Sequence, residues 1–287
     1  MIKLVLTDLD NTLIPFGKPH ASERAIAGVH ALLDAGVHFG PMTGRVPAAM
    51  EWMFAGDADC GKTGAYVNGQ MVYVDGEAVR VETLDVDALN KMAAVIAREP
   101  DCALAVYDIQ NSFQASDGTA YFMGATVDEM ARAPEVFGTN LTVIDRLDWD
   151  QCIKANVRCA CSSARKRELR DELRNRFPQF DFVFPVADGI FIDLVPAGWG
   201  KGHAVKEICT HLGIGLDEVA AFGDSENDLS MLGAVEHSVA VANASEAVVA
   251  ASRWHIGASA DDAVADALFS IAKAARTGAM PDFMRWR

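Results

Sequence analysis

Short apolar runs alternate with helical patterns along much of the chain. Residues 2–7 form a β-branched apolar run that stops at a polar cluster, as a buried parallel strand does. Ser22 predicts the cap of a helix, and residues 37–42 predict the next strand. The dipeptide Asp75-Gly76 predicts a tight hairpin. These segments indicate a β-α-β unit followed by an antiparallel pair.

The same alternation resumes after residue 189, whereas the middle of the chain has a different texture. The later predicted elements are strands at 190–195, 219–222 and 239–241 and helices beginning at 201, 246 and 262. The middle segment predicts helices at 86–97, 128–136 and 164–176, strands at 102–108 and 151–161, and a turn at Asp117-Gly118. We therefore predict an α/β fold: a doubly wound, Rossmann-like parallel sheet built from residues 1–82 and 186–287, with 83–185 inserted as a smaller α/β domain.

Composition narrows the possible partners. A formal net charge of −15 leaves no basic surface for nucleic acid or anionic membrane, and no stretch approaches the ~18 apolar residues of a membrane span. We therefore expect a cytoplasmic protein. The six cysteines show no CxxC pair, so buried reduced thiols are expected, and Cys159 and Cys161 alternate on a strand as core residues do. The tail at 281–287 offers a contact surface for a second subunit, so a homo-oligomer is an alternative that stays open.

Two acidic clusters follow apolar strands. Asp8 and Asp10 come directly after the first strand, and Asp224 follows the strand at 219–222. Carboxylates this close repel one another unless a cation lies between them, and the carboxyl ends of parallel strands meet at one sheet edge. Oxygen ligands of this kind suit Mg²⁺ when phosphate and water complete the shell. Each cluster taken alone is as typical of a helix cap as of a metal site.

Two further segments are suited to holding phosphate. Lys201 begins a predicted helix after a glycine-rich turn, and helix amino termini attract phosphate. Thr43, together with the free amides of Gly44 and Arg45, offers a second contact at the end of the second strand. Each turn by itself is more often structural, so the order and spacing of all the elements carry the prediction.

This ordered set resembles the haloacid dehalogenase superfamily of phosphotransferases. The matching motifs are Asp-x-Asp-x-Thr at 8–12, Thr43-Gly44-Arg45, Lys201, and Gly-Asp-x-x-x-Asp at 223–228, and together they span nearly the whole chain. The flanking residues are similar to the Cof-type branch, which carries an inserted type C2 cap that sets substrate specificity, and residues 83–185 occupy its place. The chain departs from the branch at Asn11, where glycine is common, and at Val241 and Ala263.

The resemblance implies roles for these residues. Asp8 is the expected nucleophile and a metal ligand, and Asp10 is the expected general acid and base that also lends its backbone carbonyl to Mg²⁺. Asp224 is the third expected ligand, and Asp228 orients metal-bound water and Lys201. Thr12 steadies the Asp10 loop, and Thr12, Thr43, Gly44, Arg45 and Asn227 are the candidate phosphate-binding residues. The expected activity is hydrolysis of a small-molecule phosphate ester through an aspartyl phosphate.

Three other functions stay open at this point. A phosphomutase uses the same aspartate, and a regulator that binds phosphorylated metabolites without turnover uses the same loops. Residues 56–63 also fit the P-loop pattern Gly-x-x-x-x-Gly-Lys-Thr, with Lys62 as its lysine. That motif requires a strand before it and a helix after it, and the sequence predicts the reverse order here.

Overall fold

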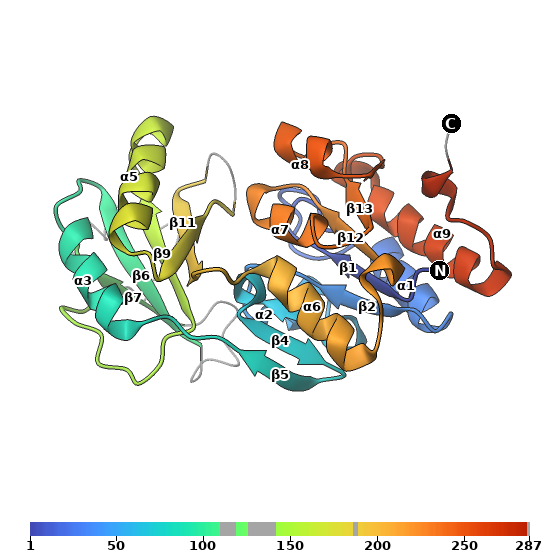
Figure 1. Cartoon of the computed structure of the whole chain (residues 1–287), viewed down its shortest axis with the longest axis horizontal. Helices are drawn as coiled ribbons and strands as arrows, with labels where there is room; N and C mark the ends of the chain where they lie inside the picture. Colours follow the sequence, from blue (N-terminus) through green and yellow to red (C-terminus); the bar gives the residue numbers. More distant parts are fainter. Residues whose placement is uncertain (110–118, 126–141, 186–188, 286–287) are drawn as a thin grey trace. The chain divides into compact units, whose positions relative to one another are not determined.

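The chain folds into two compact units. The structure is a computed structural model that describes residues 1–109, 119–125, 142–185 and 189–285. One unit consists of Met1–Val81 together with Gly200–Arg287, and the other consists of Glu82–Trp199 (Figure 1). Each unit has its own sheet and its own hydrophobic core.

A five-stranded parallel sheet forms the centre of the first unit. Its strand order is β14 (Trp254–His255), β13 (His237–Ala240), β12 (Val219–Gly223), β1 (Leu4–Thr7) and β2 (His38–Pro41). Thr7 at the end of β1 lies opposite Phe222 of β12 and Pro41 of β2, and the strands run parallel. The carboxyl ends of these strands therefore meet at one edge of the sheet. The predicted parallel core is confirmed.

Helices cover this sheet on both faces, as the alternation of apolar residues requires. The longer ones are α1 (Glu23–Leu33), α6 (Lys201–Leu212) and α9 (Ala263–Thr277), and the shorter ones are α2 (Ala49–Met53), α7 (Leu229–Leu232) and α8 (Glu246–Ala251). Leu4 and Leu6 face the core that they share with Ile208 of α6. Residues between them point to the other face, since side chains alternate along a strand. There α1 contacts β2 and α9.

A small antiparallel meander completes the first unit. It consists of β3 (Gly64–Tyr66), β4 (Met71–Val74) and β5 (Glu77–Val81). Val74 pairs with Glu77, so Asp75 and Gly76 form the two-residue turn that the sequence predicted. Both turn residues have positive φ, at 52° and 87°, as the favoured hairpin turns demand.

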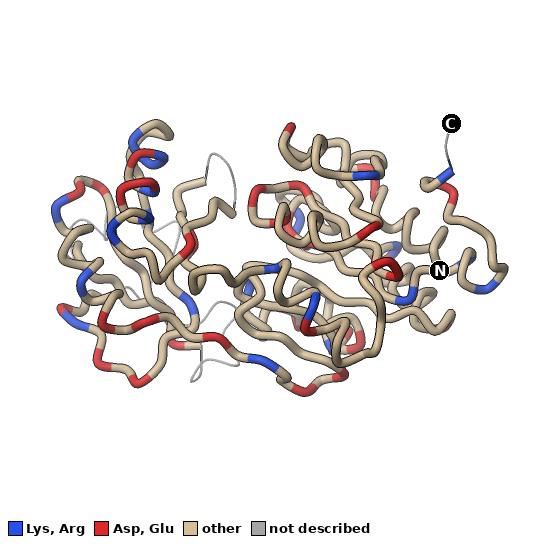
Figure 2. The backbone as a smooth tube through the Cα atoms, viewed as in Figure 1, with Lys and Arg blue, Asp and Glu red and all other residues tan. Residues whose placement is uncertain are grey.

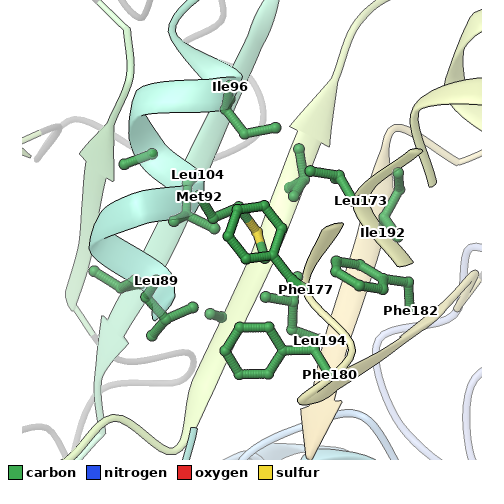
Figure 3. Packing of buried hydrophobic residues seen from close by; sticks show 14 of the residues in the cluster. Leu89, Met92, Ile96, Leu104, Leu173, Phe177, Phe180, Phe182, Ile192 and Leu194 are labelled. Atoms are coloured by element: carbon green, nitrogen blue, oxygen red, sulfur yellow. The ribbon is translucent and has the colours of Figure 1, made fainter. Parts of the chain in front are cut away.

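In its described residues, the second unit is a six-stranded sheet backed by two helices. The strand order is β10 (Phe180–Val183), β11 (Phe191–Pro196), β9 (Lys154–Cys159), β6 (Cys102–Asp108), β7 (Thr119–Met123) and β8 (Thr142–Val143), and all neighbours except β7 and β8 are antiparallel. The helices are α3 (Val86–Ile96) and α5 (Ser163–Arg176). Figure 3 shows Leu89 and Met92 of α3 and Leu173 of α5 in one core with Leu104 and Leu194 of the sheet. One face of the sheet thus holds the unit's core.

The end of the inserted segment differs from the prediction. The sequence assigned residues 190–195 to the parallel core, but β11 pairs antiparallel with β9 and β10 in the second unit. The border therefore lies between Trp199 and Gly200 instead of between residues 185 and 186. A buried apolar strand has the same sequence pattern in either sheet, because a run of apolar residues does not specify which strand it pairs with. The predicted helix at 128–136 and the turn at Asp117-Gly118 lie outside the described residues.

Charged side chains of both signs are distributed over the two units. Figure 2 shows lysine and arginine interspersed with aspartate and glutamate, for example along α5. Within the described ranges, no helix has the length and apolar character needed to cross a membrane.

Candidate active site

The acidic loops meet where β1 and β12 end. The Asp8 amide donates a hydrogen bond to the Phe222 carbonyl at 2.9 Å, which places Asp8 beside the end of the neighbouring strand. The side chains of Asp8 and Asp224 are both buried, with 6% and 4% of each residue exposed. Parallel pairing of adjacent strands therefore brings together residues that lie far apart in the sequence.

Lys201 joins two of these carboxylates. Its Nζ donates to Asp8 Oδ1 at 2.7 Å and to Asp228 Oδ1 at 2.6 Å, and the lysine and Asp228 side chains are fully buried. Burial lowers the pKa of Lys201, but the charges of Asp228 and Asp8 raise it by more, so the ammonium stays protonated. Gly69 allows this placement, since a Cβ there would lie 2.7 Å from the Gly200 carbonyl.

Asp228 is fixed by backbone donors as well as by the lysine. Its Oδ2 accepts hydrogen bonds from the amides of Asp224 at 3.0 Å and Ser225 at 3.1 Å. Gly223 makes room for it, because a Cβ at Gly223 would lie 2.6 Å from the Asp228 Cβ. The loop after β12 thus folds around one carboxylate, and that carboxylate holds Lys201 in place.

Asp224 is held by three side-chain donors. Thr12 Oγ1 donates to its Oδ1 at 2.8 Å, and Asn11 Nδ2 and Ser225 Oγ donate to its Oδ2 at 3.0 and 2.8 Å. Burial raises its pKa, the charge of Asp228 raises it further, and these hydrogen bonds oppose the shift. Thr12 was expected to steady the Asp10 loop, and its hydroxyl instead holds Asp224 across the two strands.

Asn11 and Asn243 lie at the site, and the sequence assigned neither of them a role. Asn11 has a φ of 66°, a left-handed conformation that asparagine tolerates better than most residues. Asn243 Nδ2 donates to the Asn11 carbonyl at 2.8 Å, which supports this turn. The available signal was the Asn11 departure from the usual glycine, since both residue types adopt positive φ.

The residues present fit a divalent cation. One carboxylate oxygen each from Asp8, Asp224 and Asp228 lies within 4.8 Å of the others, and all three residues are buried. Burial raises the pKa of Asp8 well above its ordinary value, and the opposing charge of Lys201 does not cancel that shift. Three ionised carboxylates against one ammonium leave two negative charges, which a single divalent ion balances.

Asp10 lies apart from this carboxylate group. Its side chain is half-exposed and accepts from Arg45 through both oxygens, with Nε at 3.1 Å from Oδ2 and Nη2 at 3.0 Å from Oδ1. The Arg45 guanidinium also lies 5.7 Å from the centre of the Trp52 ring. The group of converging carboxylates therefore contains Asp228 and not the Asp10 carboxylate.

The Thr43 turn differs from the expected phosphate contact. Thr43 Oγ1 accepts from the Arg45 amide at 3.1 Å, so that amide is not free as the sequence suggested. The short Thr side chain closes the turn on itself, as Ser and Thr often do. Asn227 Nδ2 donates to Asn68 Oδ1 at 3.1 Å, so this candidate ties the loop after β12 to the loop before β4.

Comparison with known families decides the classification. The family model described as haloacid dehalogenase-like hydrolase matches residues 5–268. The chain belongs to this family. The superfamily that the motifs predicted is thereby confirmed, and so is the predicted enzyme class, a phosphatase of the haloacid dehalogenase type.

Individual relatives agree with this family over nearly their full length. The 5-amino-6-(5-phospho-D-ribitylamino)uracil phosphatase YbjI of Escherichia coli is 24% identical over 274 residues, which cover 95% of this chain and 97% of the relative. Among solved structures, the phosphatase BT1666 of Bacteroides thetaiotaomicron has a TM-score of 0.76 and 22% identity, with 93% and 94% of the two chains covered. The subclass IIB sugar phosphatase BT4131 has a TM-score of 0.75 and 20% identity, covering 93% and 97%. These structures share the fold of this haloacid dehalogenase-like hydrolase.

The P-loop match is not part of this site. Residues 56–63 follow helix α2 and precede strand β3, the reverse of the order that a P-loop requires. Lys62 Nζ pairs with Asp59 Oδ1 at 2.5 Å on the surface. This segment is a turn of the haloacid dehalogenase-like core.

Proposed function

We propose that the chain is a Mg²⁺-dependent phosphomonoesterase that acts through an aspartyl phosphate on Asp8. The observation that carries this proposal is the buried group of Asp8, Asp224, Asp228 and Lys201, whose charges balance when one divalent ion is added. A structural role alone does not account for three buried carboxylates around one ammonium, since burying an unpaired charge costs on the order of several kcal/mol per ion. A catalytic role does account for them.

The first chemical step forms the aspartyl phosphate. Lys201 binds Asp8 Oδ1, so we assign Oδ2 as the oxygen that attacks phosphorus. The bond from phosphorus to the ester oxygen breaks, and Asp10 in its protonated form gives its proton to that leaving oxygen. Such positioned proton transfer typically supplies ~10²–10⁴-fold. The products of this step are the free alcohol and phosphorylated Asp8.

The second step releases phosphate. Asp10, now a carboxylate, takes a proton from the water that attacks phosphorus, and the bond from phosphorus to Asp8 breaks. Mg²⁺ at Asp8 and Asp224, with the Asp10 carbonyl as a further ligand, would neutralise phosphate charge in both steps. Lys201 keeps a positive charge beside the nucleophile through both steps, because its two carboxylate partners hold its proton.

The proposed substrates are small phosphorylated metabolites, with sugar and sugar-alcohol phosphates first. This class is supported by the family membership, by the printed name of the YbjI relative, which contains a phosphoribityl group, and by the sugar phosphatase of the same fold. The second unit, residues 82–199, occupies the place of the family's specificity cap, and we assign it that role.

Phosphate release from a panel of sugar phosphates, nucleotides and flavin mononucleotide tests the proposal. Release should require Mg²⁺, stop with chelator, and be lost in Asp8→Asn. Asp34→Asn is the matched control, since Asp34 is an exposed carboxylate after α1, at the opposite edge of the same sheet. Full activity in Asp8→Asn would refute the nucleophile assignment. An isomerised sugar phosphate with little free phosphate would identify a mutase instead.

Trapping the intermediate separates the two steps. Asp10→Asn lacks the base for the second step, so phosphate should accumulate on Asp8 when a substrate with a good leaving group is supplied. Peptide mass spectrometry after an acid quench locates the modification. Phosphate on any other residue would contradict the mechanism even if the chain is a phosphatase.

A further inference from the structure

Three cysteine thiols converge in the second unit, far in the sequence from the carboxylate cluster. One sulfur each from Cys102, Cys159 and Cys161 lies within 4.8 Å of the others. The sequence predicted that Cys159 and Cys161 merely fill a core, and it did not connect either of them with Cys102. All six cysteines of the chain lie within the described residues and are free thiols.

Strand pairing sets the first two thiols side by side. Cys102 of β6 lies directly opposite Cys159 of β9 in the antiparallel ladder. The Ala160 amide donates to the Asp101 carbonyl at 3.0 Å, so the next pair along is hydrogen-bonded and the cysteines form a non-hydrogen-bonded pair. Side chains approach most closely at such pairs. Both cysteines are buried, with 5% and 1% of each residue exposed.

The third thiol comes from the turn between β9 and α5. Cys161 directly precedes Ser162, whose side chain caps the 14-residue helix α5. This position places Cys161 directly before the amino terminus of the helix. Cys161 is partly exposed, so it gives an ion from solvent a way to reach the two buried sulfurs.

A buried lysine supplies the charge that thiolates need. Lys166 of α5 is 2% exposed; the neighbouring Cys102 and burial raise the pKa of Cys159, and the charge of Lys166 opposes that rise. Three thiolates around a divalent ion carry one net negative charge, and the Lys166 ammonium offsets it.

We infer that Cys102, Cys159 and Cys161 form a binding site for a thiophilic divalent cation such as Zn²⁺. Zn–S bonds of about 2.3 Å in tetrahedral geometry separate the sulfurs by about 3.8 Å, within the spacing found here. Water from the Cys161 side supplies the fourth ligand. This site goes beyond the proposed phosphatase chemistry, and its ligands differ from the hard oxygen ligands that suit Mg²⁺.

Cd²⁺ is the probe of choice, because its thiolate complexes absorb in the ultraviolet and carboxylate complexes do not. The full chain, reduced and stripped of metal, is titrated with Cd²⁺ in excess Mg²⁺, which occupies the carboxylate cluster. We expect a charge-transfer band that saturates at one ion per chain and is bleached by Zn²⁺. Binding should tighten as pH rises, since the thiols lose protons on ligation.

Variants assign the ligands. Cys161→Ser, at a partly exposed turn, should keep the fold and weaken Cd²⁺ binding at least ~tenfold, since even indirect contacts to a metal site cost that much. Cys152→Ala is the matched control, a buried cysteine of the same unit outside the cluster, and it should leave binding unchanged. Asp8→Asn should also retain the band, which separates this test from the test of the phosphatase.

Three outcomes overturn the inference. The first is the absence of a band in the wild-type chain, and the second is a band that Cys161→Ser leaves intact. The third is a purified chain that already carries a Cys102–Cys159 disulfide, seen as a mass deficit of two hydrogens, and that takes up no Cd²⁺ after reduction. Circular dichroism of each variant verifies that it is folded.

Discussion

Arg45 contacts both carboxylate oxygens of Asp10, through Nε at 3.1 Å and Nη2 at 3.0 Å. The two side chains are 36% and 48% exposed, so their attraction is screened and adds little to stability. The fork of the guanidinium nevertheless fixes the plane of the carboxylate, and the ring of Trp52 lies against Arg45. Arg45 is therefore a positioning residue for the proposed acid and base.

Replacing Arg45 should lower turnover without unfolding the chain. Arg45→Ala removes the fork, and we expect kcat to fall about 10–100-fold, because misplacing a catalytic group by an ångström costs that much. Arg45→Lys keeps the charge and loses the two-point contact, so its kcat should lie between those of the wild type and Arg45→Ala. Steady-state kinetics on the best substrate separates this positioning effect from the loss of a phosphate contact, which would raise KM and leave kcat unchanged. Arg24→Lys, in the exposed Arg24–Asp266 pair, is the control and should keep full activity.

Removing the Lys201 ammonium should destabilise the first unit. Lys201→Met leaves Asp8 and Asp228 buried without their partner, and breaking a buried pair typically costs about 3–5 kcal/mol. Urea unfolding without metal measures the loss, and added Mg²⁺ should recover part of it because the cation replaces the missing charge. Lys206→Met, exposed on the same helix, should leave the midpoint unchanged. Equal midpoints for the two variants would contradict the role of Lys201.

A methyl group at Gly223 should disturb the site through Asp228. The added Cβ would lie 2.6 Å from the Asp228 Cβ, so Asp228 must move and its bond to Lys201 must lengthen. We expect Gly223→Ala to lose activity more than tenfold and about 1–3 kcal/mol of stability, typical of overfilling a buried region. Gly233→Ala is the comparison, because its Cβ meets only the Leu229 carbonyl, at 3.2 Å. Normal phosphate release by Gly223→Ala would show that the loop tolerates the shift.

The His30–Asp57 pair should make stability depend on pH. His30 Nε2 lies 2.6 Å from Asp57 Oδ2; hydrogen bonding between them raises the pKa of His30 and lowers the pKa of Asp57. The histidine contribution is complete below its ordinary pKa of 6.5 and is lost as pH rises through the raised value. The aspartate contribution is complete above 3.8 and is lost as pH falls through the lowered value.

Their joint effect should therefore be largest between about pH 4 and pH 6.5. Both side chains are partly exposed, so we expect only about 0.2–1 kcal/mol. Unfolding midpoints of the wild type and His30→Gln across this range measure the contribution. Their difference should shrink above neutral pH, and a difference that grows there would reverse the sign of the argument. His211→Gln, exposed on α6, is the control.

Much of the parallel core could be predicted from the sequence. The strand before Asp8 and the helix beginning at Lys201 appear at the predicted places. Runs of apolar residues, their recurrence every 3.6 positions in a helix and a glycine turn are all local properties of the sequence. The motif residues at the ends of β1 and β12 were likewise recognisable, since residue type and spacing carry that information. From these alone, the family and the parallel sheet followed.

The side-chain pairings were decided only by tertiary structure. Thr12 bonds to Asp224, and Cys102 meets Cys159 and Cys161, through contacts between residues that lie far apart along the chain. The sheet to which β11 belongs was misjudged for the same reason. A local pattern specifies which residues are buried and in what kind of element. The partner that buries each one depends on how distant strands align, and that alignment is a property of the whole fold.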